Sequence, residues 1–365
     1  MKALVNRGAG NFVVEDRPDP KPAPDQLLVR PAYTAVCFSD KARYDGLGYG
    51  STWRDGLVLG HEFSGIVQAV GQDLDGWKPG DRVSVDPRSY CGQCLNCRGG
   101  AMTLCDQGIN FLGVGSGGDG GYAELCVVQE YGCYKLPEGV GTLAASMAEP
   151  MCCSTRAARL SGFAVDDNAV VFGAEDYGLF MLEWLRRGGA KNVVVVDPLK
   201  KRQEAARELG ATAVIDPAVS DVEAAVREYM PRGADIAFVQ LEDYIPETLH
   251  YLSQAYEVSR NQGSVVILRV YGRAPFAEVN PQTAHLKEVT QKFYGWFFGN
   301  EPIRGGRARG DWQVTLEAMA TGMVCPPPGT QIFDFEDLKS KKDVDEMFQG
   351  LPHSCNKAIV KIAGD

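Results

Sequence analysis

The chain has 365 residues, a length that at roughly 150 residues per domain predicts two or three domains. Its composition, 45% apolar and 23% charged residues, excludes disordered, collagen-like and coiled-coil chains. The 47 acidic residues outnumber the 37 basic ones, and a net charge of −10 repels phosphate backbones, so nucleic acid is not an expected partner. No segment approaches the roughly 18 consecutive apolar residues of a membrane span. The first residues also lack the apolar stretch of a signal peptide, so we expect a cytoplasmic protein that does not bind membranes.

The first part of the chain is predicted to be rich in β-strands. Short apolar alternations at 27–30 and 65–70 are separated by Gly, Pro and Asp turns. A glycine-rich loop at 116–121 leads into an expected strand at 122–128. We therefore expect a β-rich domain over residues 1–160.

The pattern changes in residues 161–290, where strand-like apolar segments alternate with helical patterns. Strands are expected at 169–172, 192–196, 213–215, 235–239 and 264–268, and helices at 179–187 and 201–209. Such alternation forms βαβ units, so the fold class is α/β with a doubly wound parallel sheet. The tail, 291–365, ends in an alternating segment at 357–362 that could pair with the first domain.

Four of the eleven cysteines form the most specific pattern in the chain. They read Cys-x2-Cys-x2-Cys-x7-Cys and are Cys91, Cys94, Cys97 and Cys105. Four thiolates can close a tetrahedron around zinc with no open position, as in structural sites. Iron–sulfur sequences use similar triplets but usually place a proline after the last cysteine, and here Asp106 follows. An odd number of cysteines in a reducing compartment also favours metal ligands over disulfides, so we expect a structural zinc.

A second set of metal-binding side chains is dispersed along the sequence. Cys37 follows a strand-like segment, His61 and Glu62 open the segment GHEFSGIVQAVG, and Glu149 precedes a proline. A thiolate, an imidazole and a carboxylate can hold zinc and leave a fourth position for substrate. Taken alone the set is weak evidence, because a single Cys or His is more often a packed core residue.

In chain order, these motifs resemble those of the zinc-containing medium-chain alcohol and polyol dehydrogenases. Residues 60–74 read GHE-x2-G-x5-G-x2-L; Cys-x-Ser-Asp precedes them, and the four-cysteine loop, a Gly-Gly-Tyr-Ala-Glu segment and a Glu-Pro pair follow. The resemblance spans nearly the whole chain and is to the branch that includes sorbitol and threonine dehydrogenases. It implies a GroES-like catalytic domain at 1–160, a Rossmann-type domain at 161–290, and a segment at 291–365 that completes the catalytic domain.

The resemblance also implies the ligands of a catalytic zinc. Cys37, His61 and Glu149 would hold the metal, with Glu62 as an alternative ligand that moves in. Cys152 and Cys153, which follow Glu149 closely, are further candidates, although packing at the domain junction explains them better.

Two residues next to Cys37 complete the implied catalytic set. Ser39 would pass a proton from the substrate alcohol, while zinc stabilises the alkoxide. Asp40 would orient a metal ligand through a hydrogen bond. A turn or a helix cap would explain the same two residues without catalysis.

The glycine loop at 173–178 lies between an expected strand and an expected helix, as in a dinucleotide fingerprint G-x-G-x-x-G. Gly173 and Gly178 are the first and third glycines, but Glu175 replaces the middle one, where the backbone approaches a pyrophosphate. Asp176 adds a second negative charge. At about 5 Å and an effective permittivity of about 20, each like-charge pair costs about 3 kcal/mol. The loop therefore lies where a dinucleotide would bind, but its two acidic residues would repel the phosphates.

Asp197 is evidence in favour of a dinucleotide. It ends the expected strand at 192–196, where an acidic residue hydrogen-bonds the adenosine ribose of NAD. The basic run 200–202, including Arg202, could instead bind the 2′-phosphate of NADP, although such runs are more often solvated helix faces. We therefore expect NAD over NADP. A further departure is the acidic segment 240–243, where the family has a small residue and a glycine.

Three functions remain open. The leading hypothesis is a zinc-dependent oxidoreductase that interconverts a secondary alcohol (a polyol, cyclitol or amino alcohol) and a ketone with NAD(P). The alternative, motivated by Glu175, Asp176 and Glu242, is a zinc-dependent lyase, isomerase or hydrolase with a modified or closed dinucleotide site. A catalytically silent scaffold protein is the third, and the complete set of zinc residues argues against it.

The substrate and the assembly are less defined. Because members of the family that the chain resembles are usually dimers or tetramers, we expect a homodimer or homotetramer. We expect a small-molecule alcohol or ketone as substrate. Candidate pocket residues are Tyr44, Trp53, Arg88 and the aromatic run 293–298, the last of which fits a core or a subunit interface better.

Overall fold

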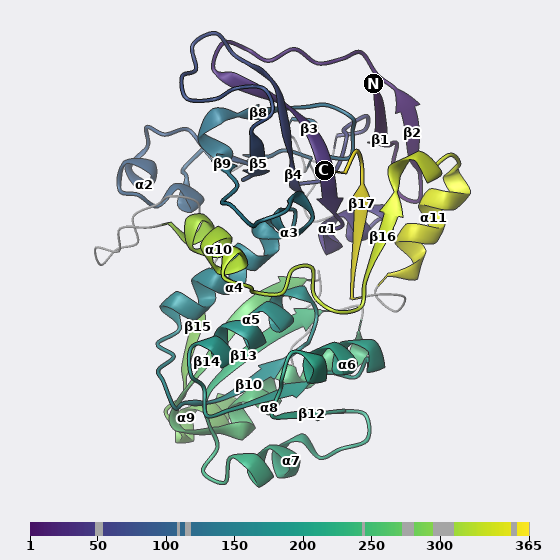
Figure 1. Cartoon of the computed structure of the whole chain (residues 1–365). Coiled ribbons are helices and arrows are strands. Elements are labelled where there is room, and N and C mark those ends of the chain that lie inside the picture. Colours follow the sequence, from purple (N-terminus) through teal and green to yellow (C-terminus); the bar gives the residue numbers. More distant parts are fainter. Residues whose placement is uncertain are drawn as a thin grey trace. The chain divides into compact units, whose positions relative to one another are not determined.

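The computed structural model describes residues 1–47, 54–107, 110–113, 118–242, 245–271, 281–294, 310–351 and 356–364. The chain forms two compact units, shown in Figure 1. Unit 1 comprises Met1–Cys152, Phe297–Pro326 and Thr330–Asp365, and unit 2 comprises Cys153–Trp296 and Pro327–Gly329. In the described part of the chain, no helix is both long enough and apolar enough to cross a membrane.

Unit 1 is built on a seven-stranded sheet. Its strands, in spatial order, are β16 (Thr330–Asp334), β17 (Lys357–Lys361), β3 (Gln26–Ala35), β4 (Glu62–Val70), β5 (Arg82–Val85) and β9 (Cys133–Lys135), and β8 (Cys126–Gln129) pairs with β3. The last strand, β17, is antiparallel to β3 and places Ile359 opposite Ala35, so the end of the chain rejoins its beginning. Two small sheets pair β1 (Lys2–Asn6) with β2 (Phe12–Asp16), and β6 (Arg88–Ser89) with β7 (Asn110–Phe111).

Short helices connect and cover the strands of unit 1. They are α1 (Phe38–Tyr44), α2 (Leu95–Arg98), α3 (Thr142–Ala145), α10 (Asp311–Ala320) and α11 (Lys341–Gly350), with 3-10 turns η1 (Met102–Leu104), η2 (Glu130–Gly132) and η4 (Phe335–Asp337). Helix α4 (Ala148–Leu160) continues from unit 1 into unit 2. In the core, the Tyr44 ring stacks on Phe348 at 5.1 Å and meets the edge of Phe12 at 5.3 Å. Tyr44 is thus a core residue.

The segment expected to be a strand at 122–128 differs from the prediction, because β8 begins only at Cys126. Tyr122 is fully buried, and its backbone N–H donates to the Leu59 carbonyl instead of to a neighbouring strand of the main sheet. Its hydroxyl reaches the Ala35 carbonyl and the Asp40 carboxylate. The buried Tyr122 side chain and its hydrogen bonds therefore determine the backbone conformation here, although the sequence pattern predicts a strand.

Unit 2 contains a six-stranded sheet in which every pair of neighbouring strands is parallel. The spatial order is β12 (Ala213–Ile215), β11 (Asn192–Val196), β10 (Asn168–Phe172), β13 (Ala234–Glu242), β14 (Ser259–Tyr271) and β15 (Thr290–Phe293). After the Asn with which each begins, β10 and β11 contain only buried apolar residues, which is typical of parallel strands covered on both faces. The predicted α/β class with a doubly wound sheet is confirmed.

Helices cover both faces of this sheet (Figure 1). Helices α5 (Asp176–Arg187) and α6 (Lys200–Glu208) share a core with Ala169 and Val171 of β10. Helices α7 (Val222–Tyr229) and α8 (Tyr251–Val258) share another core with Val170 and Phe172 of the same strand. Successive side chains of a strand alternate between faces, so one apolar strand serves both cores. The remaining short elements are η3 (Pro246–His250) and α9 (Pro281–Leu286).

Gly178 permits the close contact between the start of α5 and β10. A Cβ at this position would lie 1.9 Å from the Gly173 carbonyl oxygen and 2.6 Å from Gln240 Nε2. We expect Gly178→Ala to destabilise unit 2 by about 2 kcal/mol or more, because the clash with backbone exceeds any gain in helix propensity. Urea unfolding followed by circular dichroism measures the change.

The control for this prediction is Gly141→Ala. Gly141 has a φ of −79°, and beyond its chain neighbours no atom lies within 4 Å of the position that a Cβ would take, so an alanine fits without a clash. We expect a change below about 1 kcal/mol. Equal losses of stability in the two variants would contradict the importance of the Gly178 contact.

Candidate functional site

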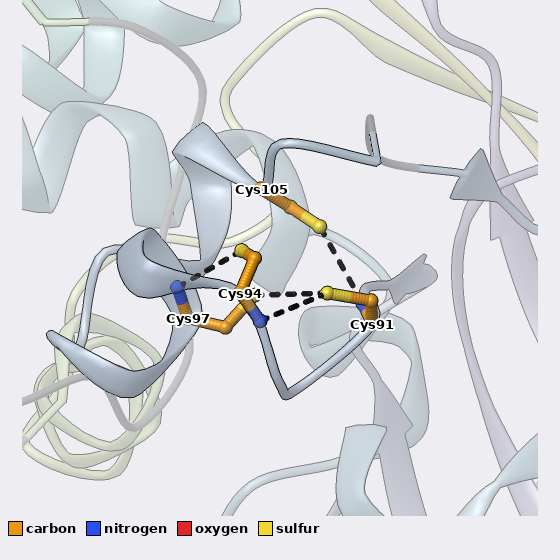
Figure 2. Close-up of side chains that lie close together, drawn as sticks. All are labelled: Cys91, Cys94, Cys97 and Cys105. Atoms are coloured by element: carbon orange, nitrogen blue, oxygen red, sulfur yellow. Dashed lines mark hydrogen bonds between the residues drawn. The ribbon is translucent and has the colours of Figure 1, made fainter.

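The four-cysteine loop folds around α2 and η1 in unit 1. The Sγ atoms of Cys91, Cys94, Cys97 and Cys105 lie within 4.8 Å of one another. Figure 2 shows the four side chains close together. The backbone N–H groups of Cys94 and Cys97 donate to the Sγ atoms of Cys91 and Cys94, each at 3.4 Å. The Cys91 N–H donates to Cys105 Sγ and is the largest cause of a lowered pKa at Cys105. N–H donors favour thiolates, so the loop is arranged to hold zinc through four sulfur atoms without an open position.

A second group in unit 1 brings Cys37, His61 and Glu62 together. Their ligand atoms lie within 4.8 Å of one another, and all three side chains are buried. Cys37 caps α1: its Sγ accepts from the Ser39 N–H at 3.4 Å, while the Asp40 carboxylate accepts from the Cys37 N–H at 3.3 Å. This reciprocal cap fixes the thiol at the start of the helix. One sulfur, one nitrogen and one carboxylate fit a zinc site with room for a substrate oxygen.

The Asp40 carboxylate lies beside the imidazole of His61. Its Oδ1 lies 3.8 Å from His61 Nδ1, and its Oδ2 accepts from the Tyr122 hydroxyl at 3.0 Å. Burial raises the pKa of Asp40 to about 6, against the opposing effect of His61. Since Nδ1 faces Asp40, Nε2 is the nitrogen left to bind a metal, and a carboxylate behind a ligating imidazole increases its basicity.

Lys357 is a functional residue that the sequence did not reveal. Its Nζ lies 2.8 Å from Glu62 Oε2, and both side chains are almost completely buried. Lys357 opens β17, far from Glu62 in sequence, and no local pattern marks it. The only signal in the sequence is a lysine inside an apolar strand. In this conformation its ammonium group neutralises Glu62.

Glu149 lies on α4 and is buried near the same group. Burial raises its pKa well above the usual range, and the Glu62 carboxylate, the next largest cause, raises it further. The set of ligand atoms within 4.8 Å of one another comprises Cys37, His61 and Glu62, so Glu149 as the third ligand stays a prediction. Of the other candidates, Cys152 is buried, and Cys153 Sγ donates to the Tyr177 hydroxyl at 3.4 Å.

Ser39 is buried on α1 directly after the capping thiol. Its Oγ has no hydrogen-bond partner among the residues that the structure describes. A hydroxyl with free donor and acceptor capacity beside a metal ligand is suited to accept and pass on a proton.

Of the remaining candidates for a substrate pocket, the structure describes Arg88, Phe293 and Tyr294. The Arg88 guanidinium is buried and binds the Asp86 carboxylate at 2.6 Å, which accounts for its charge. Phe293 is 67% exposed at the end of β15. Trp53 and residues 295–298 of the aromatic run 293–298 lie outside the described residues.

The glycine loop of unit 2 is filled by side chains of this chain. Arg269 Nη1, on β14, lies 2.5 Å from Glu175 Oε2 and 3.2 Å from Asp176 Oδ1. Asp176 Oδ1 also accepts from the Tyr177 N–H, at 2.8 Å. All three charged side chains are buried, so the charge conflict predicted from the sequence is resolved by an arginine.

The Asp197 carboxylate, at the end of β11, is likewise bound by groups of this chain. Its Oδ2 accepts from the Ala174 N–H at 2.7 Å, and its Oδ1 accepts from the Leu199 N–H at 2.8 Å. Arg202 lies between Asp197 and Glu242, with N···O distances of 3.5 and 3.1 Å. In this conformation, the loop amides and acidic side chains that would bind the phosphates and ribose of a dinucleotide are engaged with each other, so the group does not fit without a rearrangement.

The four-cysteine loop gives a direct test of its metal. We expect Cys94→Ser to lower the zinc content by about one equivalent and to lower the melting temperature, because a structural site contributes its binding energy to folding. Elemental analysis and thermal unfolding measure both effects. Cys325→Ser is the control for zinc content, because Cys325 belongs to neither group of possible metal ligands and should leave the zinc content unchanged. Unchanged zinc in Cys94→Ser would show that the loop holds no metal.

The buried ion pair of Glu62 and Lys357 gives a second prediction. Lys357→Met removes the cation and leaves a buried carboxylate, which typically costs about 3–5 kcal/mol. Adding Glu62→Gln removes that charge, so the double variant should regain much of the loss. Urea unfolding of the two single variants and the double variant measures the coupling. Additive effects would mean that the pair does not interact.

Comparison with known proteins identifies the family of this chain. Residues 23–138 match the family described as alcohol dehydrogenase GroES-like domain, and residues 178–321 match the family described as zinc-binding dehydrogenase. The chain is 32% identical to L-threonine 3-dehydrogenase of Stenotrophomonas maltophilia over 238 residues, covering 65% of this chain and 69% of the relative. It is 31% identical to (R,R)-butanediol dehydrogenase of Bacillus subtilis over 301 residues, covering 80% and 83%.

A solved structure agrees over the whole length. The crystal structure of 2R,3R-butanediol dehydrogenase from Bacillus subtilis covers 99% of both chains with a TM-score of 0.82 and 28% identity. The family match supports zinc and a nicotinamide cofactor, and the predicted resemblance is confirmed. The chain belongs to the zinc-containing medium-chain alcohol dehydrogenases and is a zinc-dependent, alcohol dehydrogenase-like oxidoreductase.

Proposed function

We propose that this protein interconverts a secondary alcohol that carries a polar group on the neighbouring carbon, such as a polyol, cyclitol or amino alcohol, and the corresponding ketone. The observation that carries this proposal is the buried group of Cys37, His61 and Glu62 with Ser39 beside it. The relatives named for threonine and butanediol support the substrate class, because both compounds are secondary alcohols with a polar neighbour.

The residues of unit 1 would divide the work as follows. Zinc bound by Cys37 and His61, with Glu149 or Glu62, would polarise the substrate oxygen and favour its alkoxide. Ser39 would take the proton of the alcohol at its Oγ and pass it on. Asp40 would keep His61 oriented, since it faces Nδ1 and is itself fixed by Tyr122.

We favour NAD over NADP as the nicotinamide cofactor. Asp197 at the end of β11 supports this choice, because an acid there repels a 2′-phosphate and suits ribose hydroxyls. Arg202 is the cation that could have bound the phosphate, and its guanidinium is engaged by Glu242 and Asp197. Comparing KM for NAD and NADP with one alcohol tests the preference.

We also propose that the protein is a cytoplasmic homodimer or homotetramer. Leu95 and Leu104 on the four-cysteine loop are 86% and 65% exposed, and apolar side chains gathered at a surface favour a protein interface. Light scattering of the purified protein measures the assembly.

Substitutions in unit 1 test the proposed chemistry. We expect His61→Ala to abolish alcohol oxidation while the zinc of the four-cysteine loop is retained. Ser39→Ala should slow turnover by roughly 10²–10⁴-fold, the usual contribution of a positioned proton-transfer group. A panel of vicinal diols, cyclitols and amino alcohols, followed by NADH absorbance, gives the rates.

Elemental analysis of the same samples separates loss of the catalytic metal from unfolding. Near wild-type turnover in His61→Ala would rule out the zinc mechanism. Activity on simple monohydric alcohols alone would rule out the proposed substrate class.

A further inference from the structure

The carboxyl ends of β10, β11, β13 and β14 meet at one edge of the sheet in unit 2, where doubly wound folds bind their ligands. Four carboxylates gather there: Glu175, Asp176, Asp197 and Glu242, and each is almost completely buried. Two guanidinium groups, Arg202 and Arg269, pair with them. With all groups ionised, the edge of the sheet already has a formal charge of −2.

The anion-binding donors of the loop are used within the chain. A dinucleotide pyrophosphate takes backbone N–H groups at the start of the helix that follows the first strand. Here the Ala174 N–H donates to Asp197 and the Tyr177 N–H donates to Asp176, at 2.7 and 2.8 Å. Carboxylates of this chain thus already accept hydrogen bonds from two N–H groups of the loop.

The Gln240 side chain lies over the same loop. Its Nε2 donates to the Gly173 carbonyl at 2.7 Å, and Gln240 is opposite Arg269 in the pairing of β13 with β14. The guanidinium carbon of Arg269 lies 4.6 Å from the centre of the Tyr177 ring, so this arginine touches the loop from two sides.

The two groups of ion pairs, Arg269 with Glu175 and Asp176 and Arg202 with Asp197 and Glu242, also influence each other's pKa values. Burial raises the pKa of Glu175, Arg269 is the largest opposing influence, and Glu242 and Arg202 of the other group contribute too. Since these groups share one low-dielectric region, moving one charge changes the balance of the rest.

We infer that unit 2 holds its dinucleotide site closed with its own carboxylates, and that a dinucleotide binds only when Arg269 exchanges Glu175 and Asp176 for the dinucleotide phosphates. Arg269 therefore has two alternative partners, the carboxylates of the loop and the phosphates of the dinucleotide. Closure lowers the affinity for the dinucleotide, because part of the binding energy is used to break the existing ion pairs. The inference rests on the proposed function only in its choice of ligand.

The experiment measures NADH affinity by calorimetry in the full-length, zinc-loaded protein. The double substitution Glu175→Gln and Asp176→Asn keeps the shape of both side chains and removes the charges that compete for Arg269. We expect NADH affinity to rise at least tenfold. In a triple variant that also carries Arg269→Gln all three side chains are uncharged, and in it the gain should disappear, because no guanidinium group is left at this position to bind phosphate.

A control separates this effect from a general change of charge. Glu204→Gln with Glu208→Gln removes two acidic charges from exposed positions of α6 and should leave the affinity unchanged. Thermal unfolding of each variant shows that it is folded. The triple variant removes Arg269 together with the two carboxylates that it compensates, so neither carboxylate is left buried without a cation.

Two outcomes would overturn the inference: equal NADH affinity in the double variant and the wild type, or a gain that survives in the triple variant. The proposed function fails separately. If the wild type oxidises alcohols with a micromolar KM for NAD and the double variant does not differ, the function stands and the closed site does not. If the double variant gains affinity but neither protein oxidises an alcohol, the closed site stands and the proposed function does not.

Discussion

A carboxylate inside a protein remains an anion only when cations or N–H groups replace the water that it has lost. Both units of this protein meet this requirement with basic residues from distant segments. In unit 1, Lys357 lies against Glu62 beside the zinc-binding group. In unit 2, Arg269 and Arg202 compensate the acidic glycine loop and its neighbours. The positions of β17 and β14 therefore determine which basic groups lie beside the carboxylates of the metal site and of the nucleotide-binding loop.

The patterns that were readable from the sequence are local ones. Apolar segments located β10, β11 and β17, and spacing located the four-cysteine loop and the segment at His61, because each depends on residues close together in the chain. Pairing across the fold was not readable. Arg269 and Lys357 each lie in an apolar strand, and only the folded sheet shows which carboxylate they meet. The segment after Gly121 was assigned to a strand too early, because the anchoring of Tyr122 is also a long-range contact.

The same reasoning explains why the glycine loop departs from the dinucleotide fingerprint without disrupting the fold. Gly173 and Gly178 serve the turn and the close packing of α5 on the sheet, and both are retained. The middle position serves the ligand and not the fold, so Glu175 is structurally tolerated once Arg269 is opposite. The family features that build the scaffold are thus separate from those that receive the cofactor.

The pairing of β17 with β3 also has a consequence for biosynthesis. Unit 1 is interrupted by unit 2 and obtains β17 and Lys357 only from a segment translated after most of unit 2. While the ribosome is still making unit 2, β3 has an open edge and Glu62 lacks its ammonium partner. Unit 2 is contiguous apart from Pro327–Gly329 and can fold first. Unit 1 therefore completes its sheet, and Glu62 gains its ammonium partner, only after β17 has been translated.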